Sequence, residues 1–542
     1  MTSLKIPAAV GLLLLTAMIV RAQTPGPAIA YGAITGRVTC EDGPVPFASV
    51  TVIAGGRDRG IGSRTVIADI EGNFKVDGLR AAALFVTASA PGYVQESASP
   101  AEGDESTPAV PQTYYHIGDN VTIRLTKGGV ITGRVLNPAG DPVIGVRVVA
   151  QSTGPPSSGF PGTGGSEAQT DDRGVYRIYG LPAGAYVVAA SAAAGNGPGG
   201  GFGGGGRGGF QRSPFANNAP VYYPSGSRAN AAEVAVTGGG ESNGIDIQYR
   251  SQRGAAVSGT VAGASTEAGR EFTVVTLAHK ASGQVVNTAF LAPRGGLVRR
   301  GASPDSFTII GVADGEYELT AHRNAGEDAA ASAPVRVLVN GSDISGLTLA
   351  LKPLASLRVR LQVESGIKCA APRPATFEEQ VFALRPDPAN QSRPLVGVPD
   401  RAGAIAFRGV PAGRYRLNAH LLDEGWFVRS IAAPAAAPSA AKPATATAPK
   451  MMEISRTGLA LKSGDRLTGV VVALSEGAAA LDGKVSKTGP RWRVHLVPVE
   501  RERIEDVLRY AETLTGDNGA FRLRNLAPGK YWVLAPLITS QV

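Results

Sequence analysis

The stretch TGDNGAFRLRNLAPGKYWVLA, residues 515–535, decides the fold because the chain carries five versions of it. The other four are ADIEGNFKVDGLRAAALFVTA at 68–88, TDDRGVYRIYGLPAGAYVVAA at 170–190, ASPDSFTIIGVADGEYELTA at 302–321 and PDRAGAIAFRGVPAGRYRLNA at 399–419. Each version reads as a tight turn, a short alternating strand, a corner and a second alternating strand. Five such repeats predict a tandem array of similar β-modules.

The turn that opens each repeat has the residue types of a β-hairpin. Asp69, Asp171 and Asp400 each precede a glycine by three residues. An aspartate bonds its own downstream backbone, and glycine accepts the positive φ that closes such a turn. After the turn, apolar residues such as Phe521 and Leu523 alternate with polar ones. A period of two predicts a half-buried strand.

The corner between the two strands looks like the tyrosine corner of a Greek-key sandwich. In that corner a tyrosine hydroxyl bonds to the backbone a few residues upstream. We expect this bond at the tyrosines of four copies, which are Tyr186, Tyr317, Tyr415 and Tyr531. The first copy has Leu84 in place of the tyrosine, so its corner is expected to be the weakest.

Length and composition indicate several all-β domains. At 542 residues the chain is too long for one core, and 71 glycines and 38 prolines suit a turn-rich protein. The repeats are spaced at roughly the ~100 residues of an immunoglobulin-like sandwich. The net charge of +9 is spread along the chain, mostly on outward strand positions, so we expect no nucleic-acid partner. We predict a rod of Greek-key β-sandwiches.

The repeats divide the chain into five units. They are unit one (31–128), unit two (129–253), unit three (254–354), unit four (355–477) and unit five (478–542). Units one to four each close with a further strand: VTIRL at 121–125, GIDIQY at 244–249, LTLAL at 347–351 and GVVVAL at 469–474. Two segments interrupt the units, a Gly-rich loop at 195–210 and an Ala/Pro-rich insertion at 432–450 that we interpret as disordered.

Residues 1–22 have the pattern of a secretory signal peptide. Lys5 precedes an apolar run that is short for a membrane span, and Ala22 suits cleavage before Gln23. No later stretch reaches the ~20 apolar residues of a transmembrane helix. We therefore expect an exported protein in the periplasm, at the cell surface or outside the cell. The two cysteines, Cys40 and Cys369, belong to different units and are expected to stay unpaired.

Little catalytic chemistry is visible. The five histidines are scattered and form no zinc motif, and neither a nucleophile elbow nor a phosphate-binding loop is present. The turn aspartates resemble calcium ligands, but each turn offers one or two carboxylates where calcium takes six to eight oxygens. We expect no catalytic residue, no cofactor and no metal, and so not an enzyme.

Two tyrosine pairs are the candidate ligand-binding residues. Tyr114 and Tyr115 in unit one, and Tyr222 and Tyr223 in unit two, lie outside the core motifs and before a closing strand. Sugars stack on exposed aromatic faces, so the pairs would form a ligand platform. In the alternative interpretation, one tyrosine of each pair packs inward and the other covers the sandwich edge.

The motifs together resemble carboxypeptidase regulatory-like domains. The Gly-x-Val openings, the Pro-Val turns, the Asp-x-x-Gly hairpins and the Gly-Leu-x-x-Gly-x-Tyr corners carry the resemblance, most clearly over 31–250 and in the second half of unit five. It implies transthyretin-like sandwiches of the carbohydrate-binding-like fold, and brings no catalytic residues. A non-catalytic exported protein that binds a polysaccharide or a cell-envelope protein is therefore expected. The alternative is an accessory region of a larger exported receptor or peptidase.

Unit five is expected to lack its closing strand. In units one to four that strand ends some 30 or more residues beyond the corner, whereas Val542 lies eleven residues beyond Tyr531. An unpaired sheet edge either aggregates or accepts a strand from a partner. Strand addition at unit five and a chain that is part of a longer one are both open explanations at this point.

Overall fold

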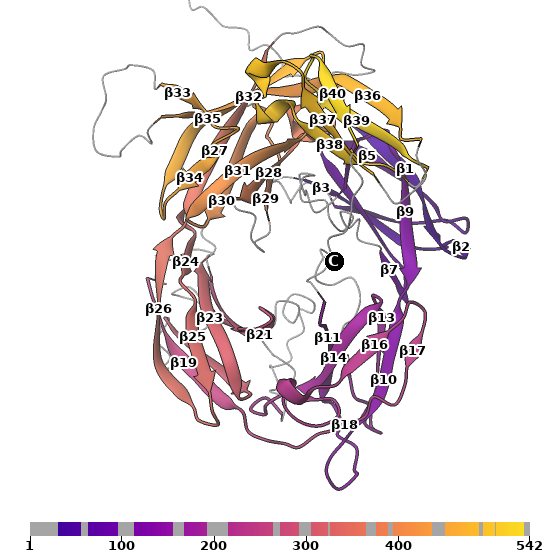
Figure 1. Cartoon of the computed structure of the whole chain (residues 1–542). Helices are drawn as coiled ribbons and strands as arrows, with labels where there is room; N and C mark the ends of the chain where they lie inside the picture. The colour runs from indigo at the N-terminus through magenta and orange to yellow at the C-terminus, as the bar shows by residue number, and fades with distance from the viewer. Residues whose placement is uncertain are drawn as a thin grey trace, which may run out of the picture.

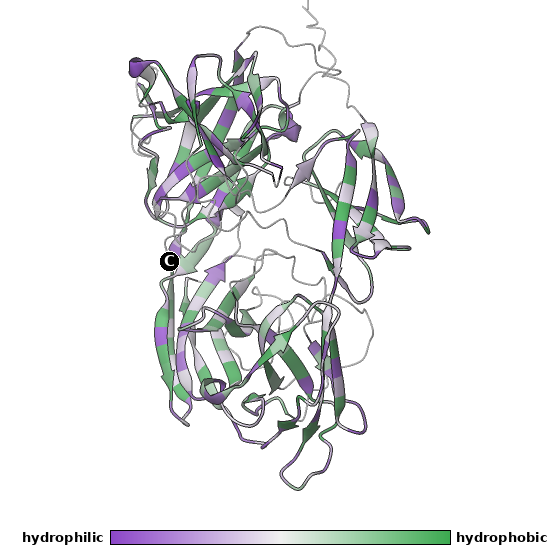
Figure 2. Cartoon of the chain, turned by 45° about the vertical axis from the view of Figure 1, so that its right-hand side comes forward, coloured by the Kyte–Doolittle hydropathy of each residue, from purple (hydrophilic) through white to green (hydrophobic). Residues whose placement is uncertain are grey.

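The computed structural model describes 31–55, 63–95, 113–154, 167–191, 215–263, 272–291, 305–323, 326–364, 376–387, 394–435, 450–486, 492–504, 506–516 and 518–535. These residues form β-strands with five short 3₁₀ turns among them. The signal segment, the Gly-rich loop at 195–210 and Cys369 lie outside the described residues. Hydrophobic and hydrophilic residues alternate along the strands of each unit (Figure 2), as half-buried strands require.

Units one and two are each built from two facing sheets. Unit one holds β1 (Tyr31–Cys40), β2 (Gly43–Pro44), β3 (Ser49–Ala54), β4 (Arg64–Ile67), β5 (Asn73–Arg80), β6 (Leu84–Ser89), β7 (Tyr93–Gln95), β8 (Tyr114–Tyr115) and β9 (Asn120–Lys127). Unit two holds β10 (Gly129–Leu136), β11 (Arg147–Ser152), β12 (Glu167–Gln169), β13 (Val175–Leu181), β14 (Gly184–Ser191), β15 (Val221–Tyr222), η1 (Arg228–Asn230), β16 (Glu233–Val236), β17 (Glu241–Ser242) and β18 (Ile247–Gln248). In each unit the first strand pairs with the hairpin strand on one side and, in parallel, with the closing strand on the other.

Units three and four repeat the pairing of the first strand. Unit three holds β19 (Ala255–Ala262), β20 (Thr273–His279), β21 (Val285–Leu291), β22 (Ser306–Val312), β23 (Gly315–Arg323), η2 (Gly326–Asp328), β24 (Ala330–Ser332), β25 (Val335–Val339) and β26 (Ile344–Pro353). Unit four holds β27 (Ala355–Glu364), η3 (Phe377–Glu379), β28 (Val381–Pro386), β29 (Leu395–Gly397), β30 (Ala404–Val410), β31 (Gly413–His420), β32 (Trp426–Pro434), β33 (Met451–Glu453), β34 (Leu459–Leu461) and β35 (Arg466–Glu476). The parallel pairs are β19 with β26 and β27 with β35. In unit three, however, β24 joins the strands into a single eight-stranded sheet.

Unit five is smaller. It holds β36 (Ala479–Lys484), β37 (Arg493–Pro498), η4 (Arg501–Arg503), η5 (Val507–Arg509), β38 (Ala511–Leu514), β39 (Ala520–Leu526) and β40 (Tyr531–Leu534). Its sheets are a two-stranded pair, β36 with β39, and a three-stranded sheet in the order β38-β37-β40. In the part of the chain that the structure describes, no strand runs parallel to β36.

The repeated corner forms as expected. The hydroxyls of Tyr186, Tyr317, Tyr415 and Tyr531 donate to the carbonyl oxygen four residues upstream at 2.8, 2.9, 2.9 and 2.6 Å. The hairpin turns also form, since the Asp171 carboxylate accepts from the backbone N–H groups of Arg173 and Val175. The prediction of all-β sandwiches is therefore confirmed.

The Ala/Pro-rich segment begins later than expected. Residues 432–434 belong to β32 and pair with β33. Ala433 and its neighbour Ile431 are buried in the core of unit four, 4% and 3% exposed. Alternating burial therefore continues the strand into a segment whose composition predicted disorder, and this part of the prediction is wrong. Residues 436–449 lie outside the described residues.

The first four units form a closed ring rather than a rod, and unit five lies against unit four (Figure 1). Adjacent units meet directly, as where the Arg466 guanidinium of unit four pairs with the Asp328 carboxylate of unit three at 2.8 Å. The ring closes between units one and four, where the Ala83 N–H donates to the Glu378 carbonyl oxygen at 2.8 Å. The expected rod is therefore wrong. The bend arises from contacts between residues far apart in sequence, which no repeat pattern encodes.

Candidate functional site

The tyrosine pair of unit two does not form an open platform. Tyr222 is 3% exposed and packs against Val187 and Ala189 on the outer side of β14. The Arg228 guanidinium lies over its ring, 5.8 Å from the centroid. Tyr223 is half-buried and packs against the core of unit two. Because a stacked sugar needs a free ring face, the assignment of this pair as a platform is corrected.

The pair of unit one is half-buried as well. Tyr115 packs against the core of unit one, and the Tyr114 ring lies against Phe85 with its centroid 6.5 Å away. Burial raises the pKa of both hydroxyls. The two residues form β8 and pair with β6, so they cover the edge of a sheet. The structure thus does not bring the four sequence-predicted site residues together into one site.

An exposed aromatic surface lies instead on unit three. Phe272 and Phe290 are 45% and 46% exposed, and their ring centroids are 6.2 Å apart. Phe290, Val274 and His322 stand opposite one another on β21, β20 and β23, so they share one face of the sheet. The opposite face carries Val275 and other residues of the unit-three core.

Hydroxyl groups form the next row of the same face. Thr276 pairs with Thr288 on one side and with Thr320 on the other. Thr276 and Thr320 are half-buried and Thr288 is buried. Two exposed aromatic rings beside hydroxyl donors and acceptors make a surface that is both apolar and capable of hydrogen bonding. We name Phe272, Val274, Phe290, His322 and these threonines the unit-three face.

Sequence reasoning missed the unit-three face for a physical reason. Phe272 precedes a strand and Phe290 lies near the end of another, separated by a hairpin. Their adjacency depends on the register of β20 with β21, and this register contains a shift between Leu277 and Ala278. Residues 289–292 around Phe290 are all apolar and do not alternate with polar ones, so the sequence carried no signal of an exposed face.

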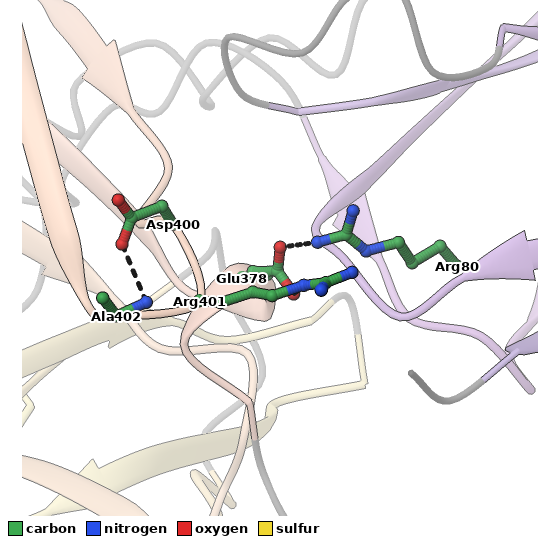
Figure 3. Close-up of a pocket in the computed structure, with 5 residues that line it drawn as sticks. All are labelled: Arg80, Glu378, Asp400, Arg401 and Ala402. Atoms are coloured by element: carbon green, nitrogen blue, oxygen red, sulfur yellow. Dashed lines mark hydrogen bonds and ion pairs between the residues drawn. The ribbon is translucent and has the colours of Figure 1, made fainter. Parts of the chain in front are cut away.

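A second notable feature is the hollow where units one and four meet (Figure 3). It has a volume of about 440 Å³ and is lined by Arg80, Glu378, Asp400, Arg401 and Ala402. The Glu378 carboxylate lies between two guanidinium groups: it pairs with Arg80, and its Oε2 is 3.7 Å from Nε of Arg401. The Asp400 carboxylate accepts from the Ala402 N–H at 2.9 Å as part of a hairpin turn.

The charges of this hollow therefore hold the ring closed. The Glu378 and Arg80 side chains are 19% and 23% exposed, so their pair is screened less by solvent than a surface pair. The backbone bond from Ala83 to Glu378 lies next to it. Each charged group has a partner within the hollow, and the arrangement serves as a contact between units.

Neither metal ligands nor a membrane helix is found among the described residues. No group of three or more His, Cys, Asp or Glu side chains there is arranged to hold a metal ion. The same residues contain no helix with the length and apolar character needed to cross a bilayer. Cys40 is a free thiol.

Comparisons with known proteins bear on the first two units. The sequence model of the carboxypeptidase regulatory-like domain matches residues 33–111 and 130–196. A search of curated protein sequences found no match.

Three solved structures are similar at low scores. The Bacillus anthracis TIE protein is 10% identical, with 84% of this chain and 75% of that chain covered and a TM-score of 0.15. A minor pilin of Streptococcus agalactiae is 10% identical, with 40% of this chain and 94% of that chain covered and a TM-score of 0.20. A putative polysaccharide-binding protein of Bacteroides thetaiotaomicron is 10% identical, with 31% of this chain and 76% of that chain covered and a TM-score of 0.18. Scores at this level carry no argument about function.

The family assignment rests on sequence and structure together. Both matched segments contain the opening strand, the Asp-x-x-Gly hairpin and strands of both sheets described above. Unit two adds the tyrosine corner, with the Tyr186 hydroxyl bonded to Pro182. Units one and two thus each contain a carboxypeptidase regulatory-like domain, and the two domains follow one another in tandem.

Proposed function

We propose that this chain is an exported, non-catalytic protein that binds a polysaccharide through the unit-three face. The exposed pair Phe272 and Phe290 is the observation that carries the proposal. A pyranose ring has an apolar C–H side and a rim of hydroxyls. The aromatic rings match the apolar side, and Thr276, Thr320 and His322 offer hydrogen bonds to the rim.

The position of this face supports the proposal. The sheet that contains β21 and β23 lies on the side of unit three nearer the middle of the ring (Figure 1). The two exposed phenylalanine rings lie next to each other, and contiguous exposed apolar groups are typical of binding surfaces. The resemblance of the modules to the carbohydrate-binding-like fold points to the same ligand class.

The non-catalytic part of the proposal rests on how the recurring carboxylates are used. Asp171 and Asp400 each accept two backbone N–H bonds in a hairpin turn. These bonds lower the pKa of Asp171, which suits a structural carboxylate rather than a proton donor. Export is proposed from the signal-like sequence at 1–22.

The test is retention on insoluble polysaccharides. The double variant Phe272→Ala and Phe290→Ala should lose retention by at least about tenfold, because stacking contributes about 1–3 kcal/mol per ring by analogy with other stacked rings. Tyr179→Ala is the matched control, since Tyr179 is 52% exposed on unit two. Equal melting temperatures would show that both variants fold.

Two outcomes would contradict the proposal. One is equal retention of the wild type and the double variant. The other is failure of the wild type to be retained on any polysaccharide of a broad panel. Replacing Tyr222 is a poor test, because Tyr222 is buried beneath Arg228 and its loss disturbs packing.

A second candidate function is that of an accessory region of a larger exported receptor or peptidase. The open sheet edges of unit five favour it. Strand β40 pairs only with β37 among the described residues, and Trp532 on it is 61% exposed. Exposed edges with apolar side chains are typical of surfaces that join other chains.

A further inference from the structure

The closing strand of each complete unit has a fixed register on the first strand. In unit three, Gly259 of β19 stands opposite Leu347 of β26, and Val261 stands opposite Leu349. In unit one, Gly36 of β1 stands opposite Val121 of β9 by the same rule. The closing strand therefore runs parallel to the first strand and places apolar residues at alternate positions over the core.

The glycine in this register makes room for the closing strand. A Cβ built at Gly36 or Gly259 would lie 2.0 or 2.1 Å from a carbonyl oxygen of that strand, and one at Gly133 would lie 2.1 Å from the Ile245 carbonyl oxygen, just before β18. No side chain fits there. Glycine inside a strand costs about 0.5–1 kcal/mol relative to alanine, so its recurrence here has a packing cause.

Unit five has a glycine at the same position of its first strand, but no carbonyl oxygen is among the three atoms nearest to a Cβ built there. Gly483 occupies the same place in Leu-Asp-Gly-Lys-Val as Gly259 does in Val-Ser-Gly-Thr-Val, and it pairs with Phe521 as Gly259 pairs with Phe307. The three atoms nearest to a Cβ built at Gly483 all belong to the Phe521 ring. Among the described residues, no strand pairs with the other edge of β36, where the closing strand lies in the complete units.

The core of unit five is open at the same place. Leu481 and Val485 are half-buried, whereas their counterparts in unit three, Val257 and Val261, are 0% and 1% exposed. Phe521 is half-buried too. The apolar residues that a closing strand would cover are thus the ones that remain exposed.

We propose that unit five accepts an extended strand from a partner protein, running parallel to β36 with apolar side chains opposite Gly483 and Val485. Main-chain bonds to the free edge of β36 supply affinity, and the alternate apolar residues supply specificity. A second copy of this chain is a poor donor, because the closing strands of units one to four are each paired within their own unit. The proposal is independent of polysaccharide binding.

The test uses the full chain and a synthetic peptide that copies residues 343–352, DISGLTLALK, the closing strand of unit three. Saturating peptide should slow amide exchange over 481–485 by at least about tenfold, which equals about 1.4 kcal/mol. Exchange over 34–38 in unit one should not change. The matched control is the same peptide with Leu347→Asp and Leu349→Asp, which should have no effect.

A chain variant tests the glycine directly. Gly483→Val should abolish the peptide effect, since the side chain blocks the incoming carbonyl. Exchange over 493–498, in the other sheet of unit five, reports whether the variant still folds; if it does not, the two peptides with the wild-type chain decide the matter.

Three results would overturn the proposal. The first is no difference between the two peptides. The second is protection of 481–485 equal to that of 34–38 in the monomer without peptide, which would mean that the chain itself fills the space. The third is protection that rises with protein concentration together with dimerisation, which would make the donor a second copy.

Discussion

Units three and five are built from the same repeat, yet only unit three is closed. Phe307 and Tyr317 of unit three are 4% and 1% exposed, whereas Phe521 and Tyr531 at the same positions are half-buried. The corner hydrogen bond is nevertheless present in both units, at 2.9 and 2.6 Å. The corner therefore forms locally, and burial of the core depends on a strand that comes from elsewhere.

This difference separates two contributions to stability. The hairpin and the corner are made by residues close in sequence, so they are available to every copy of the repeat. The closing strand adds long-range pairing and removes apolar surface from water, which contributes about 25 cal/mol per Å². Unit five has the first contribution and lacks the second, and this contrast can be tested.

The largest effect is expected from removal of the corner side chain. Tyr317→Ala should destabilise unit three by about 3–5 kcal/mol, because it empties a filled core position. Tyr531→Ala should cost unit five about 1–2 kcal/mol, since much of its ring already contacts water. Chemical denaturation followed by amide exchange in each unit measures both. Equal losses would show that the two cores are equally closed.

Amide exchange should show the next largest difference. Strand β14 is paired on both edges, with β11 and with β16, whereas β40 pairs with β37 alone among the described strands. Residues 531–534 should therefore exchange at least about tenfold faster than residues 184–191. Exchange by mass spectrometry on the monomer measures this. Equal protection would contradict the open edge.

A smaller effect is expected when only the hydroxyl is removed. Tyr317→Phe leaves the Ala313 carbonyl without the hydroxyl of a side chain that is 1% exposed, which costs about 1–3 kcal/mol. Tyr531→Phe should cost about 1 kcal/mol or less, because the Tyr531 side chain is half-buried and its hydrogen bond gains less from exclusion of water. Melting curves of the two variants against the wild type give the comparison. A larger loss for Tyr531→Phe would reverse the order of burial inferred here.

The local features were predictable from the sequence, and the long-range ones were not. Period-two alternation and the Gly-x-Tyr corner gave the strands and all four corner bonds, because each depends on a few adjacent residues. The sequence could not show which side of the sheet Tyr222 and Tyr223 face. Strand β15 spans Val221–Tyr222 only, which is too short for an alternating pattern. The contact of Ala83 with Glu378 joins residues of different units, and nothing in either repeat marks it.

The smallest effect concerns pH, and it depends on the closure of unit three. The imidazole of His279 stacks on the ring of Tyr317, with centroids 4.8 Å apart and 28° between the planes. Burial, with a smaller contribution from the charge of Arg228, lowers the pKa of His279 to about 4. Burial also lowers the pKa of His420 in unit four.

The direction in which stability changes with pH follows from proton binding. The unfolded chain protonates His279 near pH 6.5, and the folded chain does so near pH 4, so between these values the unfolded state holds more protons. Stability therefore falls as the pH drops from about 6.5 toward 4. Because His279 is only half-buried, solvent screening limits its contribution to the free energy of unfolding to about 1 kcal/mol.

His279→Phe keeps a ring against Tyr317 and removes the titration, so melting of unit three should depend less on pH in the variant. If the melting temperature of the variant changes with pH between 6.5 and 4 as much as that of the wild type does, another group causes the pH dependence. His420→Phe is then the next variant to measure.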